Sequence, residues 1–128
     1  MDDMGIFRTT IEIASFGAAE RKTALHGVMV DTGSEYSWIP AGVLRALGIA
    51  PERVDRFETA DKRILERPVG YMLVFAGGRA APTAVAFAQP GDLIRLGAHA
   101  LDGMNLAVDS ARCELVPGGP VPVAAVAA

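Results

Sequence analysis

The sequence is poor in cysteine, histidine and aromatic residues. Its 128 residues include one cysteine and two histidines, and 6% of them are Phe, Trp or Tyr. A single cysteine cannot form an intrachain disulfide, which favours a reducing compartment, and we expect Cys113 to be a small buried side chain. His26 and His99 have no Cys, His or carboxylate at metal-ligand spacing, so we expect structural or surface roles for both. No metal and no cofactor is predicted.

Charge of one sign and long hydrophobic runs are also lacking. The formal net charge is −3, and the arginines are scattered, so no basic field for nucleic acid or anionic lipid is expected. The N-terminal sequence MDDMGIFRTT is acidic and lacks the apolar core of a secretory signal. The most apolar tract, PVPVAAVAA, is about half as long as a membrane-spanning helix. We therefore expect a cytoplasmic protein with no nucleic-acid and no membrane partner.

The chain does have enough apolar residues for a core, since 51% of its residues are hydrophobic. This length and content fit one domain, predicted over residues 1–116 and followed by a Pro/Gly/Ala-rich tail over 117–128. Alternation and turn residues predict an all-β fold with one or two short helices. Strands are expected at 6–15, 23–31, 53–60, 63–75, 81–88, 93–96, 106–108 and 113–116, and helices at 39–49 and 98–104.

One stretch, VMVDTGSEYSWIP (residues 28–40), places an aspartate directly after an apolar run. An ionised carboxylate that leaves water is costly unless it is paired or hydrogen-bonded, so Asp31 requires an explanation. The first possible explanation is a strand-ending turn, because Asp and Ser cap backbone groups and Gly supplies positive φ. An active site is the other. The tripeptide Asp-Thr-Gly by itself does not distinguish a turn from an active site, so the neighbouring sequence has to be considered.

Three features occur in order around this aspartate: VMVDTGS, the hairpin RFETADKRILERPVGY, and the hydrophobic-Gly turn and helix LIRLGAHALDGM. In these features the chain resembles the single-lobe, retropepsin-like aspartic proteases over roughly residues 6–116. The resemblance implies a closed acid-protease-like β-barrel in which the hairpin is the substrate-covering flap. It also implies that Asp31, Thr32 and Gly33 form the catalytic signature.

Peptide hydrolysis by this class needs two aspartates, which share one proton and activate a water molecule. The chain has one Asp-Thr-Gly, so the resemblance implies a homodimer with the active site on its two-fold axis and a polypeptide as substrate. Thr32 would hydrogen-bond to the other subunit's loop, and Gly33 would let the backbone approach the carboxylates.

The resemblance also suggests residues that bind substrate. The Ser34 hydroxyl either donates to the catalytic carboxylate, which would favour acidic activity, or simply caps the turn. Tyr36 and Trp38 follow the signature and are candidates for the lining of the cleft, with packing on the core expected for Trp38. The predicted substrate-binding residues are Ser34, Ile39, Ile94, Leu96 and Gly97, with Val30 as a further apolar candidate for the cleft wall.

Two departures from the family pattern bear on function. The predicted flap tip is Asp61-Lys62-Arg63 rather than glycine-rich. Ala98 stands where the retroviral enzymes carry an arginine that pairs with an acid, here Glu35, and Arg95 is either its substitute partner or solvated. The alternative is therefore a catalytically silent retropepsin-like module for dimerisation or peptide binding. A ligand-binding β-barrel unrelated to proteases would leave Asp31 unexplained.

Overall fold

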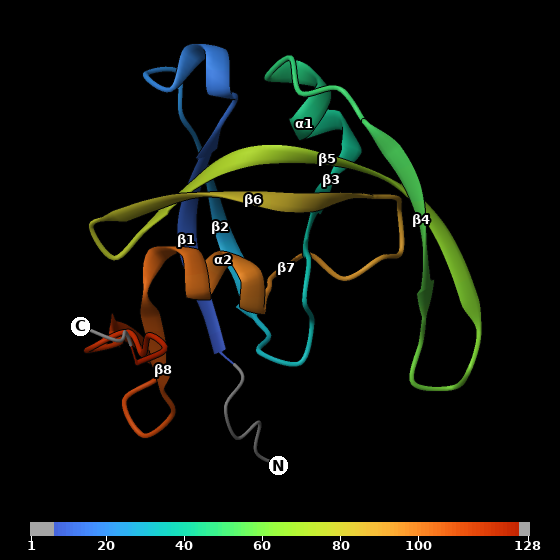
Figure 1. The fold of residues 1–128 in the computed structure, drawn as a ribbon. Coiled ribbons are helices and arrows are strands. Elements are labelled where there is room, and N and C mark those ends of the chain that lie inside the picture. Colours follow the sequence, from blue (N-terminus) through green and yellow to red (C-terminus); the bar gives the residue numbers. More distant parts are fainter. Residues whose placement is uncertain (1–6, 126–128) are drawn as a thin grey trace.

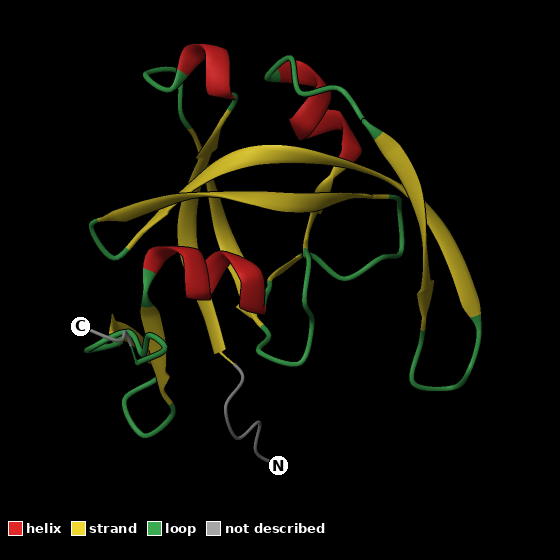
Figure 2. Cartoon of the chain, in the orientation of Figure 1, coloured by secondary structure: helices red, strands yellow, loops and turns green. Residues whose placement is uncertain are grey.

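A computed structural model describes residues 7–125 of the chain (Figure 1). In that range the fold is mainly β, with two short α-helices and one 3-10 turn, which confirms the predicted class (Figure 2). The elements are β1 (Phe7–Ala14), η1 (Phe16–Ala18), β2 (Thr23–Val30), β3 (Ser37–Pro40), α1 (Ala41–Ala46), β4 (Arg53–Glu58), β5 (Ile64–Ala76), β6 (Arg79–Ala88), β7 (Arg95–Leu96), α2 (Ala98–Met104), β8 (Leu106–Asp109) and β9 (Glu114–Pro117).

Seven strands form one sheet in the order β1-β2-β7-β3-β6-β5-β4, and β8 pairs with β9 separately. Strand β1 also pairs with β5, so the pairings of six strands return to their starting point. The ring is not the regular closed barrel that was expected. Strand β7 contributes two residues and meets β3 at a single residue pair, so the ladder is interrupted there.

Two hairpins account for the longest strands. Strands β5 and β6 pair antiparallel from Val69↔Ala86 to Ala76↔Arg79, and Gly77 and Gly78, both with positive φ, form the two-residue turn. Strand β5 extends beyond β6 to pair with β4, from Arg53↔Val69 to Glu58↔Ile64. This second hairpin leaves the body as a curved arm (Figure 1). Its predicted strands and polar turn are thereby confirmed.

The core fills the space inside the ring. Its largest fully buried side chains include Phe87, Met72, Leu44 and Met104, which come from both strands and helices. Helix α2 lies over β6 (Figure 1). Its buried residues, Ala100, Leu101 and Met104, recur at helical spacing, which is why a seven-residue helix covers the sheet here. The predicted helix over 98–104 is confirmed.

Several sequence-based expectations need correction. Residues 37–40 form the strand β3, and the helix predicted over 39–49 is limited to Ala41–Ala46. Pro40 is both the last residue of that strand and the N-cap of the helix, and its fixed φ of −53° is compatible with that junction. The strand expected over 93–96 contains Arg95 and Leu96 alone. Cys113 is exposed rather than buried, since it lies with φ 54° in the turn between β8 and β9.

Candidate active site

Asp31 follows β2 directly, at the point where that strand leaves the sheet. Its backbone N–H donates to the carbonyl of Leu96 over 2.9 Å, which continues the parallel pairing of β2 with β7. The carboxylate Oδ1 accepts the backbone N–H of Gly33 over 3.0 Å. The side chain remains 22% exposed. The apolar strand thus ends in a carboxylate that is held by the turn and still reaches solvent.

The loop after Asp31 interlocks with the turn between β7 and α2. The N–H groups of Ala98 and His99 donate to the carbonyls of Ser34 and Glu35 over 2.7 and 3.1 Å. Gly97 directly precedes these two donor residues, and a Cβ added there would come within 2.4 Å of the Tyr36 carbonyl oxygen. No side chain fits at that distance. The sequence Leu96-Gly97 therefore lets the two loops approach and fixes the position of the aspartate.

Arg95 binds the aspartate from the neighbouring strand. Its Nη1 lies 3.1 Å from Oδ2 of Asp31, and the two side chains are 23% and 22% exposed. The guanidinium carbon lies 5.8 Å from the centre of the Trp38 ring. Within residues 7–125, Nε of Arg95 is buried and has no hydrogen-bond partner. The carboxylate therefore has one N–H and one guanidinium as partners.

The sequence left Arg95 either as a partner of Glu35 or solvated, and in the structure it contacts Asp31. Glu35 lies 4.0 Å from His99 instead. Strand alternation carried the missing signal: Leu96 is fully buried, so Arg95 points to the opposite side of the strand. Asp31 follows the buried Val30, so its side chain also points away from the buried side of the sheet. The parallel register of Val30 with Leu96 then brings the acid and the base together.

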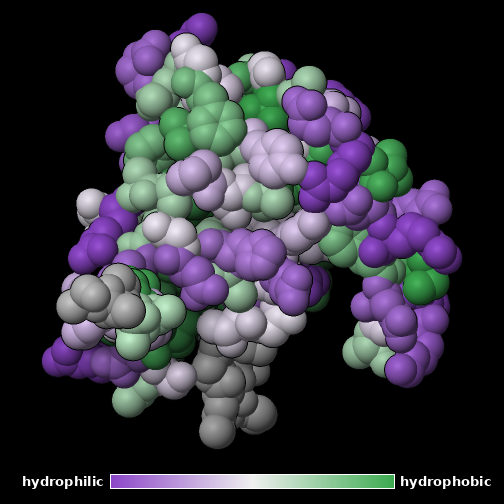
Figure 3. Space-filling model, viewed as in Figure 1, coloured by the Kyte–Doolittle hydropathy of each residue, from purple (hydrophilic) through white to green (hydrophobic). Residues whose placement is uncertain are grey.

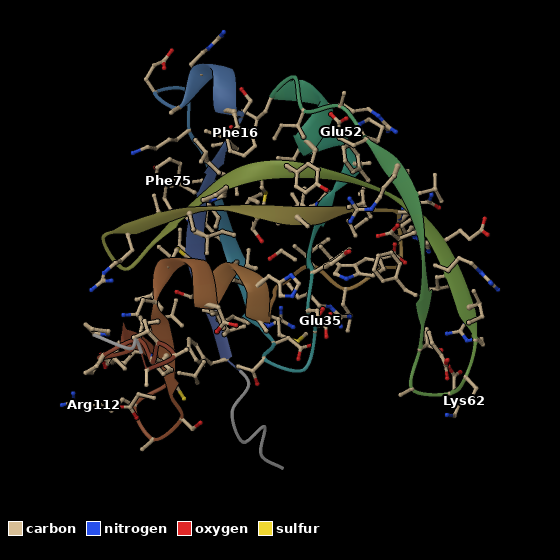
Figure 4. The ribbon with its side chains drawn as sticks, in the orientation of Figure 1. Phe16, Glu35, Glu52, Lys62, Phe75 and Arg112 are labelled. Carbon is tan, nitrogen blue, oxygen red and sulfur yellow. The ribbon has the colours of Figure 1, made fainter. Side chains whose placement is uncertain are left out.

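A cleft of about 930 Å³ lies between the Asp31 loop and the β4–β5 hairpin. In the space-filling view a hollow separates the hairpin from the body (Figure 3). Glu35 lies on the body and Lys62 at the tip of the hairpin, on opposite sides of this hollow (Figure 4). The cleft is lined by Gly33, Ser34, Glu35, Tyr36, Trp38, Asp55, Arg56, Phe57, Glu58, Thr59, Ala60, Arg63, Leu65, Gly91, Asp92, Leu93 and Arg95.

Aromatic contacts attach the base of the hairpin to the body. The Phe57 ring lies 4.8 Å from that of Trp38 and 5.6 Å from that of Tyr36, both in edge-to-face geometry. Arg53 donates to Asp55 and to the hydroxyls of Tyr36 and Tyr71. The hydrogen bond to the Tyr71 hydroxyl is the largest cause that raises the pKa of Arg53. These contacts hold the base of the β4–β5 hairpin against the body, whereas the tip of the hairpin extends beyond them.

A second ion pair involves Asp92, which also lines the cleft. Arg67 on β5 donates Nε and Nη2 to the two oxygens of Asp92 over 2.7 and 2.9 Å. Their side chains are 14% and 11% exposed. The hydrogen bond from Arg67 is the main reason why the pKa of Asp92 is lowered, and the Gln89 N–H adds to it. This pair joins the hairpin strand to the loop that leads into β7.

The predicted site residues fall into two groups. Thr32 is exposed, and Gly33 and Ser34 line the cleft. The Ser34 hydroxyl donates to the Tyr36 carbonyl over 2.7 Å, which is the turn-capping alternative and not the bond to the carboxylate. The second group belongs to the core or packs on it: Val30, Ile39, Leu96 and Gly97 are buried, and Ile94 is half-buried against the core.

The apolar cleft wall expected from Ile39 and Leu96 is therefore corrected. Both side chains are fully buried, because alternation turns them into the ring. Trp38 packs on a small cluster with Ala86 and Ala88, as expected, and one face also borders the cleft. Tyr36 lines the cleft, as the sequence allowed, and so do Phe57 and Arg95, which were not among the predicted substrate-binding residues.

Over the described part of the chain, no group of three His, Cys, Asp or Glu side chains is placed to hold a metal ion. The same residues, 7–125, contain no helix long and apolar enough to cross a membrane. In comparisons with known proteins, no family model and no curated protein matches the chain.

Proposed function

We propose that the chain is one half of a homodimeric aspartic endopeptidase, in which the Asp31 carboxylates of two copies activate a water molecule. The observation that carries the proposal is the position of Asp31. Its carboxylate is bound by Gly33 and Arg95, two residues that also line a cleft of about 930 Å³ beneath a hairpin. Asp31 itself is not among the residues that line the cleft, so an extended polypeptide lying there would meet Gly33 and Arg95 and reach the carboxylate beside them.

In the proposed reaction, Asp31 carries out the proton transfer, and Gly33 and Thr32 position it. One Asp31 carboxylate takes a proton from water, while the other, protonated, donates to the scissile carbonyl oxygen. The Gly33 N–H orients the carboxylate by holding Oδ1 at 3.0 Å. The exposed Thr32 is available to contact the loop of the second copy. In the dimer the ring of strands would form the single acid-protease-like lobe of each subunit.

The flap role belongs to the β4–β5 hairpin. Strand β4 is the edge of the seven-stranded sheet, so one row of its N–H and C=O groups has no neighbouring strand in the described chain. An extended peptide recognises such groups by main-chain hydrogen bonds. The aromatic contacts of Phe57 hold the base of the hairpin over the cleft. The charged tip requires no glycine, because Lys62 itself adopts the positive φ of 71°.

Asp31→Asn tests the proposal directly. The amide keeps the shape of the carboxylate and loses the base, so cleavage of a diverse peptide library between about pH 3 and 7 should be abolished while fold and dimer persist. Asp102→Asn, on the exposed face of α2, is the matched control and should retain full activity. Specific activity should also fall on dilution through the dimer dissociation constant, as measured beside sedimentation velocity.

The Arg95–Asp31 ion pair favours a second candidate, the catalytically silent module. The guanidinium lies 3.1 Å from Oδ2 of Asp31, and so it occupies an oxygen that the water and the shared proton would need. Under this alternative the cleft binds peptides without cutting them. Purified wild-type dimer that binds library peptides and cleaves none across the same pH range would support the module and overturn the protease.

A further inference from the structure

The cleft contains both acidic and basic side chains, and the acids already have partners. Asp92 is held by both donors of Arg67, and Asp55 accepts from Arg53. Glu58 lies 3.4 Å from Lys62, and Glu35 lies 4.0 Å from His99. Asp92 and Asp55 are therefore paired with arginines. Glu58 lies near a lysine, and Glu35 lies near an imidazole that offsets its charge only when protonated.

Two of the three basic residues that line the cleft are paired in the same way. Arg63 lies 3.0 Å from Asp61, and Arg56 lies 4.0 Å from Glu66; both arginine side chains are about 70% exposed. Arg95 differs from them in burial and in partners. It is 23% exposed, its Nη1 alone contacts a carboxylate, and within residues 7–125 its buried Nε lacks any partner. A guanidinium offers five N–H donors, so most of those of Arg95 are unused by side chains.

The one carboxylate that Arg95 contacts is the one whose protonation the proposed reaction changes. When one Asp31 of the pair carries the shared proton, its Arg95 loses an anionic partner in a partly buried place. A second carboxylate offered by the substrate would replace it, since a guanidinium binds carboxylates through paired N–H donors. Strand β7 holds the backbone of Arg95 in register with Met29 and Trp38, so a change of partner would require movement of the guanidinium alone.

We propose that Arg95 is a specificity-determining residue that selects polypeptides with an Asp or Glu side chain next to the scissile bond. The acidic side chain binds the guanidinium, draws it away from Oδ2 of Asp31, and thereby frees that oxygen for the water and the shared proton. This inference rests on the proposed protease function. It adds that Arg95, which contacts Asp31 before substrate binds, also recognises the acidic side chain of the substrate.

Matched peptides test the proposal without any change to the protein. A series that carries Glu, Gln or Leu at each position flanking the cleaved bond is compared on the wild-type dimer. The Glu peptide should have kcat/KM at least about tenfold above that of its Gln counterpart at one flanking position, the size expected for a hydrogen-bonded charge pair. Equal cleavage of the three peptides at both flanking positions overturns the proposal and leaves the protease intact.

Variants then identify the residue responsible. Arg95→Leu should reduce the Glu-over-Gln preference to about onefold, and Arg95→Glu should favour Lys in its place. Arg56→Leu, which removes an exposed guanidinium from the same cleft, should leave the preference unchanged. Near-ultraviolet circular dichroism checks that each variant is folded. A preference that survives in folded Arg95→Leu contradicts the assignment to Arg95.

Binding separates this inference from the proposed function. In the Asp31→Asn protein, fluorescence anisotropy of labelled peptides should show Glu peptides bound at least about tenfold more tightly than Gln peptides, because the amide competes less for the guanidinium. The added Arg95→Leu change should remove this difference. If wild type cleaves nothing yet this binding difference is found, the protease is overturned and the role of Arg95 as a reader of acidic peptides stands. No binding difference overturns that role.

Discussion

The hydroxyl of Ser37 accepts the backbone N–H of Gly97 over 2.9 Å, across sixty positions of sequence. Ser37 is fully buried, and Gly97 is buried as well. The bond joins the first residue of β3 to the residue between β7 and α2, directly beneath the Asp31 loop. The position of the candidate catalytic carboxylate therefore depends on a buried polar contact that lies outside the cleft.

Ser37→Ala should destabilise the fold and weaken the site together. Removal of the hydroxyl leaves a buried N–H without a partner, which costs about 1–3 kcal/mol of unfolding free energy. Urea denaturation measures this loss. Ser34→Ala is the control, because the Ser34 hydroxyl bonds a half-buried turn carbonyl and the replacement should cost less. An unchanged unfolding midpoint for Ser37→Ala would contradict the structural role given to this bond.

Gly97→Ala should separate the two interlocked loops. The new methyl group would lie 2.4 Å from the Tyr36 carbonyl oxygen and 2.7 Å from that of Ser34, both of them backbone atoms with little freedom to move. Overpacking of this kind costs about 1–3 kcal/mol, and the displacement of Asp31 should remove peptide cleavage. Gly42→Ala in α1 meets nothing within 4 Å and should be neutral or slightly stabilising. Thermal unfolding of both variants gives the comparison.

The Arg67–Asp92 pair should make stability depend on pH. The pKa of Asp92 is lowered in the folded protein from its ordinary value of 3.8, chiefly by the hydrogen bond from Arg67. The stabilisation is therefore fully present above about pH 5 and is lost as the pH falls through 3.8 towards the folded pKa. Asp92→Asn should cost about 2 kcal/mol at pH 7 and progressively less below about pH 4.

Chemical denaturation of wild type and Asp92→Asn at a series of pH values measures this difference. Asp102→Asn serves as the surface control and should follow the wild-type curve at every pH. A wild-type advantage over Asp92→Asn that stays constant from pH 7 to about pH 3 would show that the charge of Asp92 does not carry the stabilisation.

The β4–β5 hairpin should be the most mobile ordered element of the protein. Its tip, residues 59–63, lies beyond the aromatic contacts of Phe57, and β4 has a single neighbouring strand among residues 7–125. Hydrogen exchange should therefore be fast for the tip and slow for β6, and a bound peptide should slow the tip alone. Slow exchange at the tip without ligand would identify a rigid hairpin and contradict a flap.

Ser34→Ala should leave the pH dependence of peptide cleavage unchanged. The Ser34 hydroxyl donates to the carbonyl of Tyr36 and not to Asp31, so its loss removes no donor from the carboxylate. The measurement is kcat/KM against pH for both proteins. A displaced profile would mean that the hydroxyl turns towards Asp31 when a substrate or a second copy is bound.

Much of the architecture was predictable because its signals are local. Alternation and turn residues located β1, β2, β5 and β6, and the Leu96-Gly97 turn located the start of α2. Glycine pairs and polar turn residues marked both hairpin turns. The strand β3 was missed, because four residues after a loop contain too little alternation to separate a strand from the start of a helix.

The sequence by itself determined that an aspartate would end an apolar strand and that Gly33 would follow it in a turn. Such features depend on neighbours in the chain. The tertiary structure alone decided that Arg95 binds Asp31 across 64 positions, and that Ser37 holds Gly97 across 60. Both contacts depend on how β2, β3 and β7 come together in the sheet, and a shift of one residue in the pairing would exchange the two faces. That choice is made by packing of the whole core, which no local pattern contains.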